Sequence, residues 1–89
     1  MFQFTKFIQT SFGNPLFSFT KIFTLAGERY YVFVRNREGK IYSFAMEQKG
    51  VRWFILNPIN VHDWVIEVET ELAGAISEYN DSRFGSKFF

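Results

Sequence analysis

Residues 30–46 read YYVFVRNREGKIYSFAM, and this stretch constrains the fold more than any other part of the chain. Two runs rich in aromatic and β-branched residues flank the polar tip RNREGK, which predicts a β-hairpin. Side chains alternate between the two faces of a strand, and here both faces are apolar. Three covers for the second face are open: another part of this chain, a second copy of it, or a ligand.

The size and composition of the chain limit the folds and functions that are possible. Its 89 residues predict a single domain with one core. Aromatic residues make up 21% of it, with 13 Phe, which is more than a small core needs and indicates oligomerisation or a functional surface. The absence of Cys excludes disulfides and thiolate metal sites. Without a signal-like leader or an 18-residue apolar run, we expect an intracellular protein, in the cytoplasm or the nucleoid or nucleus, with no membrane contact.

Charge is segregated along the sequence. Residues 17–57 carry seven basic residues against three acidic ones, whereas residues 58–82 carry six acidic residues and no Lys or Arg. Segregation by segment often becomes segregation by face in the folded protein.

The first 57 residues predict a short N-terminal element and a β-meander. In segment 1–16, Phe4, Phe7, Ile8 and Phe12 have near-helical spacing, which favours a short helix, although the alternation around Phe4 also fits a strand. Turns at AG (26–27), NREG (36–39) and KG (49–50) predict four strands at about 17–25, 28–35, 40–48 and 51–57. The last turn would place Glu47 opposite Arg52.

Residues 61–80 predict a long helix, because apolar residues recur there at i, i+3, i+4 and i+7. The stripe consists of Val61, Trp64, Val65, Val68, Leu72, Ala75, Ile76 and Tyr79. The tail 81–89 has turn chemistry. The expected fold is therefore α+β: a four-stranded antiparallel meander packed on a long C-terminal helix.

The predicted turns sort the strand side chains into two faces. The face assigned to the core beneath the helix contains Phe17, Phe19, Phe23, Tyr30, Val32, Val34, Ile41, Ser43, Ala45, Phe54 and Leu56. The opposite face contains Ser18, Thr20, Ile22, Thr24, Arg29, Tyr31, Phe33, Arg35, Lys40, Tyr42, Phe44, Met46, Trp53 and Ile55. This second face combines five aromatic and three basic residues with no acidic one.

Such a face suits single-stranded nucleic acid, because bases stack on aromatic rings and basic residues attract phosphates. The candidate stacking residues are Tyr31, Phe33, Phe44 and Trp53, and the candidate phosphate-binding residues are Arg29, Arg35, Arg37, Lys40 and Lys49. Two other interpretations stay open. The face can be covered by segment 1–16. Alternatively, the chain is a small protein-interaction module or inhibitor whose aromatic face binds a protein partner or a second subunit, since Tyr, Trp and Arg are also enriched at protein interfaces.

The stretch VFVRNREGKI (32–41), the tripeptide LNP (56–58) and Trp64 resemble the positive-cofactor-four family of transcriptional coactivators. The matching positions are Val32, Val34, Arg35, Asn36, Gly39, Lys40, Ile41, Leu56, Asn57, Pro58 and Trp64. The resemblance covers residues 17–80 and implies a four-stranded antiparallel sheet with a C-terminal helix. It also implies a homodimer that binds single-stranded DNA with basic and aromatic residues of the sheet. The chain departs from the family in the tight turn after SFAMEQKG and in the longer spacing from Pro58 to Trp64.

The sequence contains no recognisable catalytic constellation. His62 is the single histidine and is expected on a solvent-facing flank of the helix. Glu67 and Glu71 lie one helical turn apart, but no second acidic or histidine motif converges with them, so a solvated acidic face is expected. The glycines do not form a phosphate-binding pattern. We therefore expect a binding protein without catalytic residues, metal or cofactor.

Overall fold

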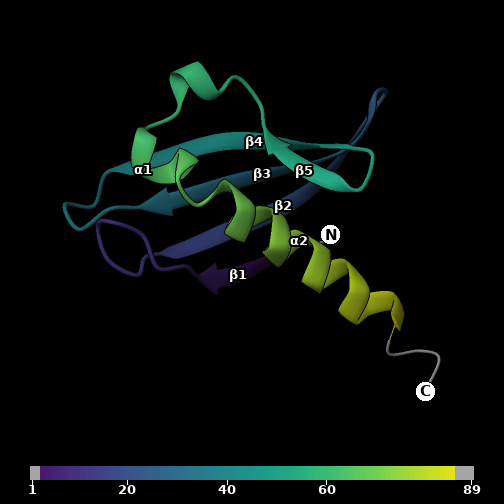
Figure 1. Cartoon of the computed structure of the whole chain (residues 1–89), viewed down its shortest axis with the longest axis horizontal. Helices are drawn as coiled ribbons and strands as arrows, with labels where there is room; N and C mark the ends of the chain where they lie inside the picture. The colour runs from purple at the N-terminus through teal and green to yellow at the C-terminus, as the bar shows by residue number, and fades with distance from the viewer. Residues whose placement is uncertain (1–2, 86–89) are drawn as a thin grey trace.

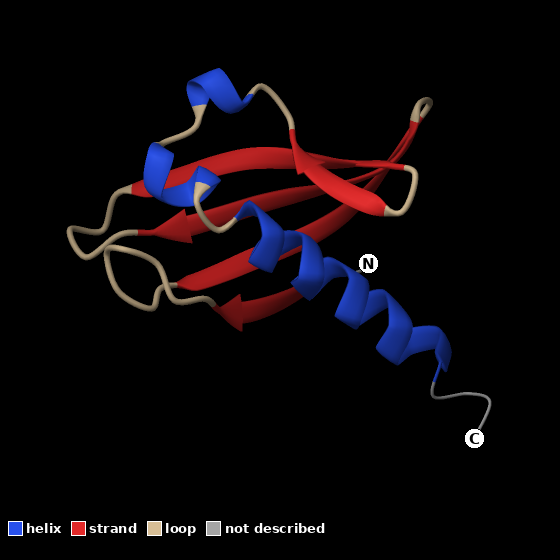
Figure 2. Ribbon diagram, viewed as in Figure 1, coloured by secondary structure: helices blue, strands red, loops and turns tan. Residues whose placement is uncertain are grey.

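A computed structural model describes the backbone of residues 3–85 and the side chains of residues 3–80. The strands are β1 (Gln3–Phe7), β2 (Leu16–Thr24), β3 (Gly27–Arg35), β4 (Ile41–Lys49) and β5 (Arg52–Ile55). They form one antiparallel sheet in the order β1-β2-β3-β4-β5 (Figures 1 and 2). The α+β class is confirmed, whereas the expected count of four strands is wrong because five are present.

The fifth strand is β1, in the segment where the spacing favoured a helix. It pairs with β2, with Phe4 opposite Phe19 and Phe7 opposite Leu16. The Phe4 ring stacks on Phe19 at 4.4 Å and on Tyr79 at 4.3 Å between ring centroids. Phe4 and Phe7 therefore point to opposite faces, and the strand alternation noted around Phe4 is the pattern that the structure adopts.

The loop between β3 and β4 reverses the predicted faces of β4 and β5. The Asn36 carboxamide oxygen accepts hydrogen bonds from the backbone N–H groups of Glu38 and Lys40, both at 2.9 Å. These bonds hold Lys40 in the loop, so Arg35 pairs with Ile41 rather than with Lys40. A shift of one residue moves every following side chain to the other face of the sheet.

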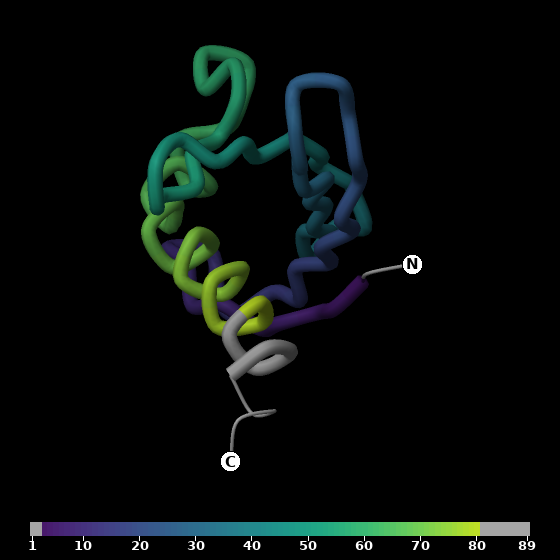
Figure 3. The backbone as a smooth tube through the Cα atoms, turned by 90° about the vertical axis from the view of Figure 1, so that its right-hand side faces the viewer, coloured from purple at the N-terminus to yellow at the C-terminus, as the bar shows by residue number. Residues whose placement is uncertain are grey.

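The C-terminal part of the chain forms three pieces, of which the two helices lie on the inner, concave face of the sheet, whereas the 3₁₀ turn protrudes beyond the sheet and buries no residue (Figure 1). They are the 3₁₀ turn η1 (Pro58–Asn60), the short helix α1 (Asp63–Ile66) and the long helix α2 (Glu69–Gly85). The sheet curls around the two helices, so that sheet and helices together enclose the core (Figure 3). The predicted single helix over 61–80 is thus interrupted before Glu69, and α2 continues into the segment that was expected to be a tail; residues 86–89 lie outside the described residues.

The predicted apolar stripe faces the sheet. Val65, Val68, Leu72, Ala75 and Ile76 are buried against strand side chains that include Phe17, Phe19, Tyr30, Val32, Val34, Phe44, Met46, Trp53 and Ile55. Glu69, at the start of α2, accepts a hydrogen bond from the backbone N–H of Ile55 at 2.8 Å, which ties the helix to the edge strand β5. In the described part of the chain, no helix has the length and apolar character needed to cross a membrane.

Candidate functional site

The outer, convex face of the sheet points away from α2 and is the first candidate site. We define this outer face as the side chains at odd positions of β1, β3 and β4 and at even positions of β2 and β5. None of the described helices packs on it, because α1 and α2 lie on the inner side and η1 protrudes beyond the sheet (Figures 1 and 3). Segment 3–15 does not cover it either, since β1 extends the sheet instead.

Two exposed aromatic rings occupy the centre of the outer face. Tyr31 and Phe33, on the middle strand β3, are 55% and 40% exposed. Their cross-strand neighbours are small: Thr20 and Ala45 beside Tyr31, and Ser18 and Ser43 beside Phe33. Because no large side chain stands on either flank, the surfaces of both rings remain open to a flat ligand.

Basic residues lie at both ends of this aromatic pair. At one end, Arg29 forms an ion pair with Glu47 at 3.0 Å between Nη2 and Oε2. At the other end, Arg35 has no ion-pair partner among the side chains that the structure describes. Lys49 and Arg52 are cross-strand partners beyond Glu47. Glu47 is the one acidic residue of the described outer face. The expectation that this face contains no acidic residue is therefore wrong.

The structure brings only some of the predicted nucleic-acid-binding residues together. Arg29, Tyr31, Phe33 and Arg35 line up along β3, and Lys49 lies on the same face. Arg37 and Lys40 are in the β3–β4 loop rather than on a strand. Phe44 and Trp53 are 8% and 2% exposed and belong to the core. Their predicted position beside Tyr31 is wrong, because the Asn36 loop reverses the faces of β4 and β5.

The predicted partner of Glu47 also changes. The structure pairs Lys49 with Arg52 and Glu47 with Phe54, so Arg52 is not opposite Glu47. The carboxylate of Glu47 bonds to Arg29 on the other neighbouring strand instead, with its Oε2 accepting from Nε at 3.1 Å.

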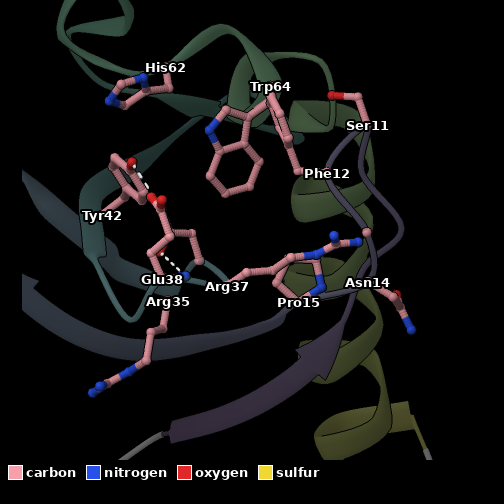
Figure 4. A pocket seen from close by; sticks show the side chains of 12 residues that line it. Ser11, Phe12, Asn14, Pro15, Arg35, Arg37, Glu38, Tyr42, His62 and Trp64 are labelled. Atoms are coloured by element: carbon pink, nitrogen blue, oxygen red, sulfur yellow. Dashed lines mark hydrogen bonds between the residues drawn. The ribbon is translucent and has the colours of Figure 1, made fainter.

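A second candidate site is an open cleft of about 790 Å³ at the end of the sheet where β3 ends and β4 begins. The β1–β2 loop, the β3–β4 loop and the start of α1 form its walls (Figure 4). Phe12, Tyr42, His62 and Trp64 supply aromatic rings, and Arg35 and Arg37 supply positive charge. The sequence pattern pointed to both arginines and placed Tyr42 on the candidate binding face, but it did not point to Phe12, His62 or Trp64. The four rings come from three segments far apart in the chain.

The described residues contain no group of three or more His, Asp or Glu side chains placed to hold a metal ion. Comparisons of the chain with known protein families, with curated proteins and with solved structures found no match.

Proposed function

We propose that this protein binds single-stranded nucleic acid on the outer face of its sheet. The observation that carries the proposal is the pair of exposed rings, Tyr31 and Phe33, on the central strand, each between two small neighbours. Residues two apart on a strand are separated by roughly 7 Å, which provides two separate stacking positions along one line. Proteins that read unpaired bases commonly stack two or three of them on aromatic residues of a sheet.

The charge of the outer face agrees with this ligand. Arg35 continues the line of Tyr31 and Phe33, and its guanidinium has no ion-pair partner among the described side chains, so it is available to a phosphate. Duplex DNA fits less well, because its grooves admit a helix or a two-stranded ribbon rather than a broad convex sheet.

The resemblance of residues 32–41 to the positive-cofactor-four family adds a biological setting. It points to a role in transcription or genome maintenance and to a homodimer. Arg35 belongs both to the resembling motif and to the line of outer-face residues, so it is the position where the two arguments meet.

A second candidate function has its own observation. Phe7, Leu16 and Ile41 are 62%, 41% and 52% exposed and lie in one row across the outer face, interrupted by Arg35. An exposed apolar row of this kind is typical of protein interfaces. In this alternative, the outer face binds a protein partner or a second copy of the chain, and the aromatic pair contributes to that interface.

The test is a titration of a fluorescent single-stranded oligonucleotide, followed by anisotropy at about 50 and about 200 mM salt, with duplex DNA for comparison. Phe33→Ala and Tyr31→Ala are each expected to weaken binding by roughly tenfold, because stacking contributes about 1–3 kcal/mol per base. Phe23→Ala is the matched control, since Phe23 is 66% exposed but does not belong to the outer face. The Phe23→Ala variant should bind the oligonucleotide with the same affinity as the unchanged protein.

Arg35→Ala should lower both the affinity and its dependence on salt, because one phosphate contact is lost. Absence of binding at the lower salt concentration, or equal effects of Phe33→Ala and Phe23→Ala, would overturn the proposal. In that case, sedimentation or light scattering of the Leu16→Asp variant, set against the unchanged protein, tests the apolar row as a subunit interface.

A further inference from the structure

The cleft at the end of the sheet has the composition of a ligand site. Its Trp64 ring lies 5.9 Å from Phe12 and 5.7 Å from Tyr42, and Tyr42 lies 4.6 Å from His62, all between ring centroids. All three contacts are edge-to-face, unlike the stacked pairs of Phe4 in the core. These contacts gather the four rings at one end of the sheet without a stacked pair among them, which gives the cleft an aromatic wall.

Hydrogen bonds preform the two loops that carry these side chains. In the β1–β2 loop, the buried Thr10 hydroxyl donates to the Gly13 carbonyl at 2.9 Å and accepts from the Phe12 N–H at 3.0 Å. This holds Phe12 at the tip of the loop. In the β3–β4 loop, the Asn36 side chain bonds two backbone N–H groups and donates to the Tyr42 hydroxyl at 3.4 Å. Preformed loops reduce the entropy lost on binding.

The cleft also carries positive charge. Arg37 extends from the β3–β4 loop toward Asn14 and Pro15 on the opposite wall (Figure 4). The guanidinium reaches Gly13 on that wall: a Cβ added at Gly13 would lie 3.5 Å from Arg37 Nη2. The Arg37 side chain therefore extends from one wall of the cleft to the other. Arg37 has no ion-pair partner among the described side chains. The acidic residue Glu38 is outnumbered by Arg35 and Arg37 in the lining.

From these observations, we infer that the cleft is a nucleotide-binding site. Trp64 and Tyr42 would contact the base, and Arg37 would hold the phosphate. Inorganic phosphate would leave the aromatic wall unused, and an uncharged flat compound would leave Arg37 without a partner. The volume of about 790 Å³ lies within the range of roughly 300–1,000 Å³ that small-molecule sites occupy.

The same chemistry can come from two sources: a free mononucleotide, or the terminal nucleotide of a strand that lies on the outer face. Arg35 belongs to the outer face and also lines the cleft, with its guanidinium directed away from Trp64 (Figure 4). A strand could thus pass from Phe33 over Arg35 into the cleft. Only this second source rests on the proposed function, whereas binding of a free mononucleotide is independent of it.

Tryptophan fluorescence provides the assay. Trp53 is 2% exposed in the core, whereas Trp64 is partly exposed in the cleft, so a ligand there changes mainly the emission of Trp64. We would titrate adenosine and uridine monophosphates, the two nucleosides and inorganic phosphate. The expected result is saturable quenching by a monophosphate, with the nucleosides and inorganic phosphate binding at least roughly tenfold more weakly. The Trp64→Phe variant should lose the signal.

Arg37→Ala should weaken monophosphate binding by roughly tenfold, since a charge-assisted contact is lost. Lys6→Ala is the matched control: it removes a cation that pairs with Glu78 and does not line the cleft. A 5′-phosphorylated oligonucleotide and its unphosphorylated form distinguish the sources. If only the phosphorylated strand binds in an Arg37-dependent manner, the ligand is a strand end.

Equal affinity for nucleosides and monophosphates, or no Arg37-dependent binding of any of these probes, would overturn the inference. This failure differs from failure of the proposed function, which is measured by the effect of Phe33→Ala on unphosphorylated oligonucleotides. The variants change exposed or partly exposed side chains, and far-UV circular dichroism verifies that each one is folded before its affinity is compared.

Discussion

Replacing Phe4 by Ala tests whether the N-terminal segment is a strand of the sheet. The Phe4 ring is stacked between Phe19 of β2 and Tyr79 of α2, with interplanar angles of 3° and 15°. Removing a buried Phe side chain typically costs about 3–5 kcal/mol. Because Phe4 is only partly buried, we expect a loss of about 2–3 kcal/mol in the free energy of unfolding. For a domain of this size, the melting temperature should fall by roughly 10–20 °C.

Phe7→Ala is the matched control on the same strand. Phe7 is 62% exposed on the outer face, so its loss should change the free energy of unfolding by no more than about 0.5 kcal/mol. A helix would give a different result, because positions 4, 7 and 8 share one helical face and both Phe residues would then be buried together. Urea unfolding of both variants, followed by far-UV circular dichroism, measures the difference.

Similar losses for Phe4→Ala and Phe7→Ala would refute the strand and restore the helical interpretation. A neutral Phe4→Ala would show that the stacked contacts between sheet and helix do not contribute to stability. Either result would change the count of strands and the surface that is available on the outer face.

Two further substitutions test hydrogen bonds that join the sheet to α2. In Tyr30→Phe, the buried hydroxyl that donates to Asn80 Oδ1 at 3.0 Å is lost, which should lower the free energy of unfolding by about 1 kcal/mol in a urea titration. Glu69→Ala removes the acceptor of the Ile55 N–H, so we expect a loss of about 1–2 kcal/mol and faster hydrogen exchange at that amide. Glu71→Ala is its control, because it removes an exposed charge from the same helical turn, whereas the hydrogen bond to Ile55 is made by Glu69. Unchanged exchange of the Ile55 amide in Glu69→Ala would contradict the prediction.

The faces of β2 and β3 could be predicted from the sequence even though the turn between them was misplaced. The structure pairs Thr24 with Gly27, whereas the predicted turn paired Leu25 with Glu28. The two registers differ by two residues, and a shift of two leaves each side chain on its original face. For this reason, the prediction placed Tyr31 and Phe33 correctly on the face away from the helix.

The faces of β4 and β5 could not be predicted in the same way. The deciding contacts are the two hydrogen bonds from the Asn36 side chain, which lengthen the loop by one residue and keep Lys40 out of β4. Alternation of apolar residues does not reveal them, because apolar residues occur on both faces of β4: Ile41 and Ala45 on one, and Phe44 and Met46 on the other. Asn is a residue that commonly bonds to the backbone two residues ahead, so Asn36 was the available signal.

The cleft is formed by segments that are far apart in the sequence, so it could not be predicted from local sequence patterns. Phe12 was assigned to a short helix, and Trp64 to a stripe that packs on the sheet. Because the N-terminal segment is a strand, its connection to β2 brings Phe12 to within 5.9 Å of Trp64. The β1–β2 connection, which exists because β1 is a strand of the sheet, thus forms one wall of the proposed nucleotide site.

The charge segregation of the sequence becomes a difference between two sides of the molecule. Glu67, Glu71 and Glu78 are exposed on the helical side, whereas Arg35, Lys49 and Arg52 are exposed on the outer face. A polyanion would be attracted to the outer face and repelled by the helical side, so this charge distribution agrees with the proposed binding of a strand on the outer face. The three basic residues lie at the two ends of the sheet, and a strand bound between them would cross Tyr31 and Phe33. The path proposed for the strand therefore agrees with both the charge distribution and the exposed rings, and Arg35→Ala tests the contribution of the charge.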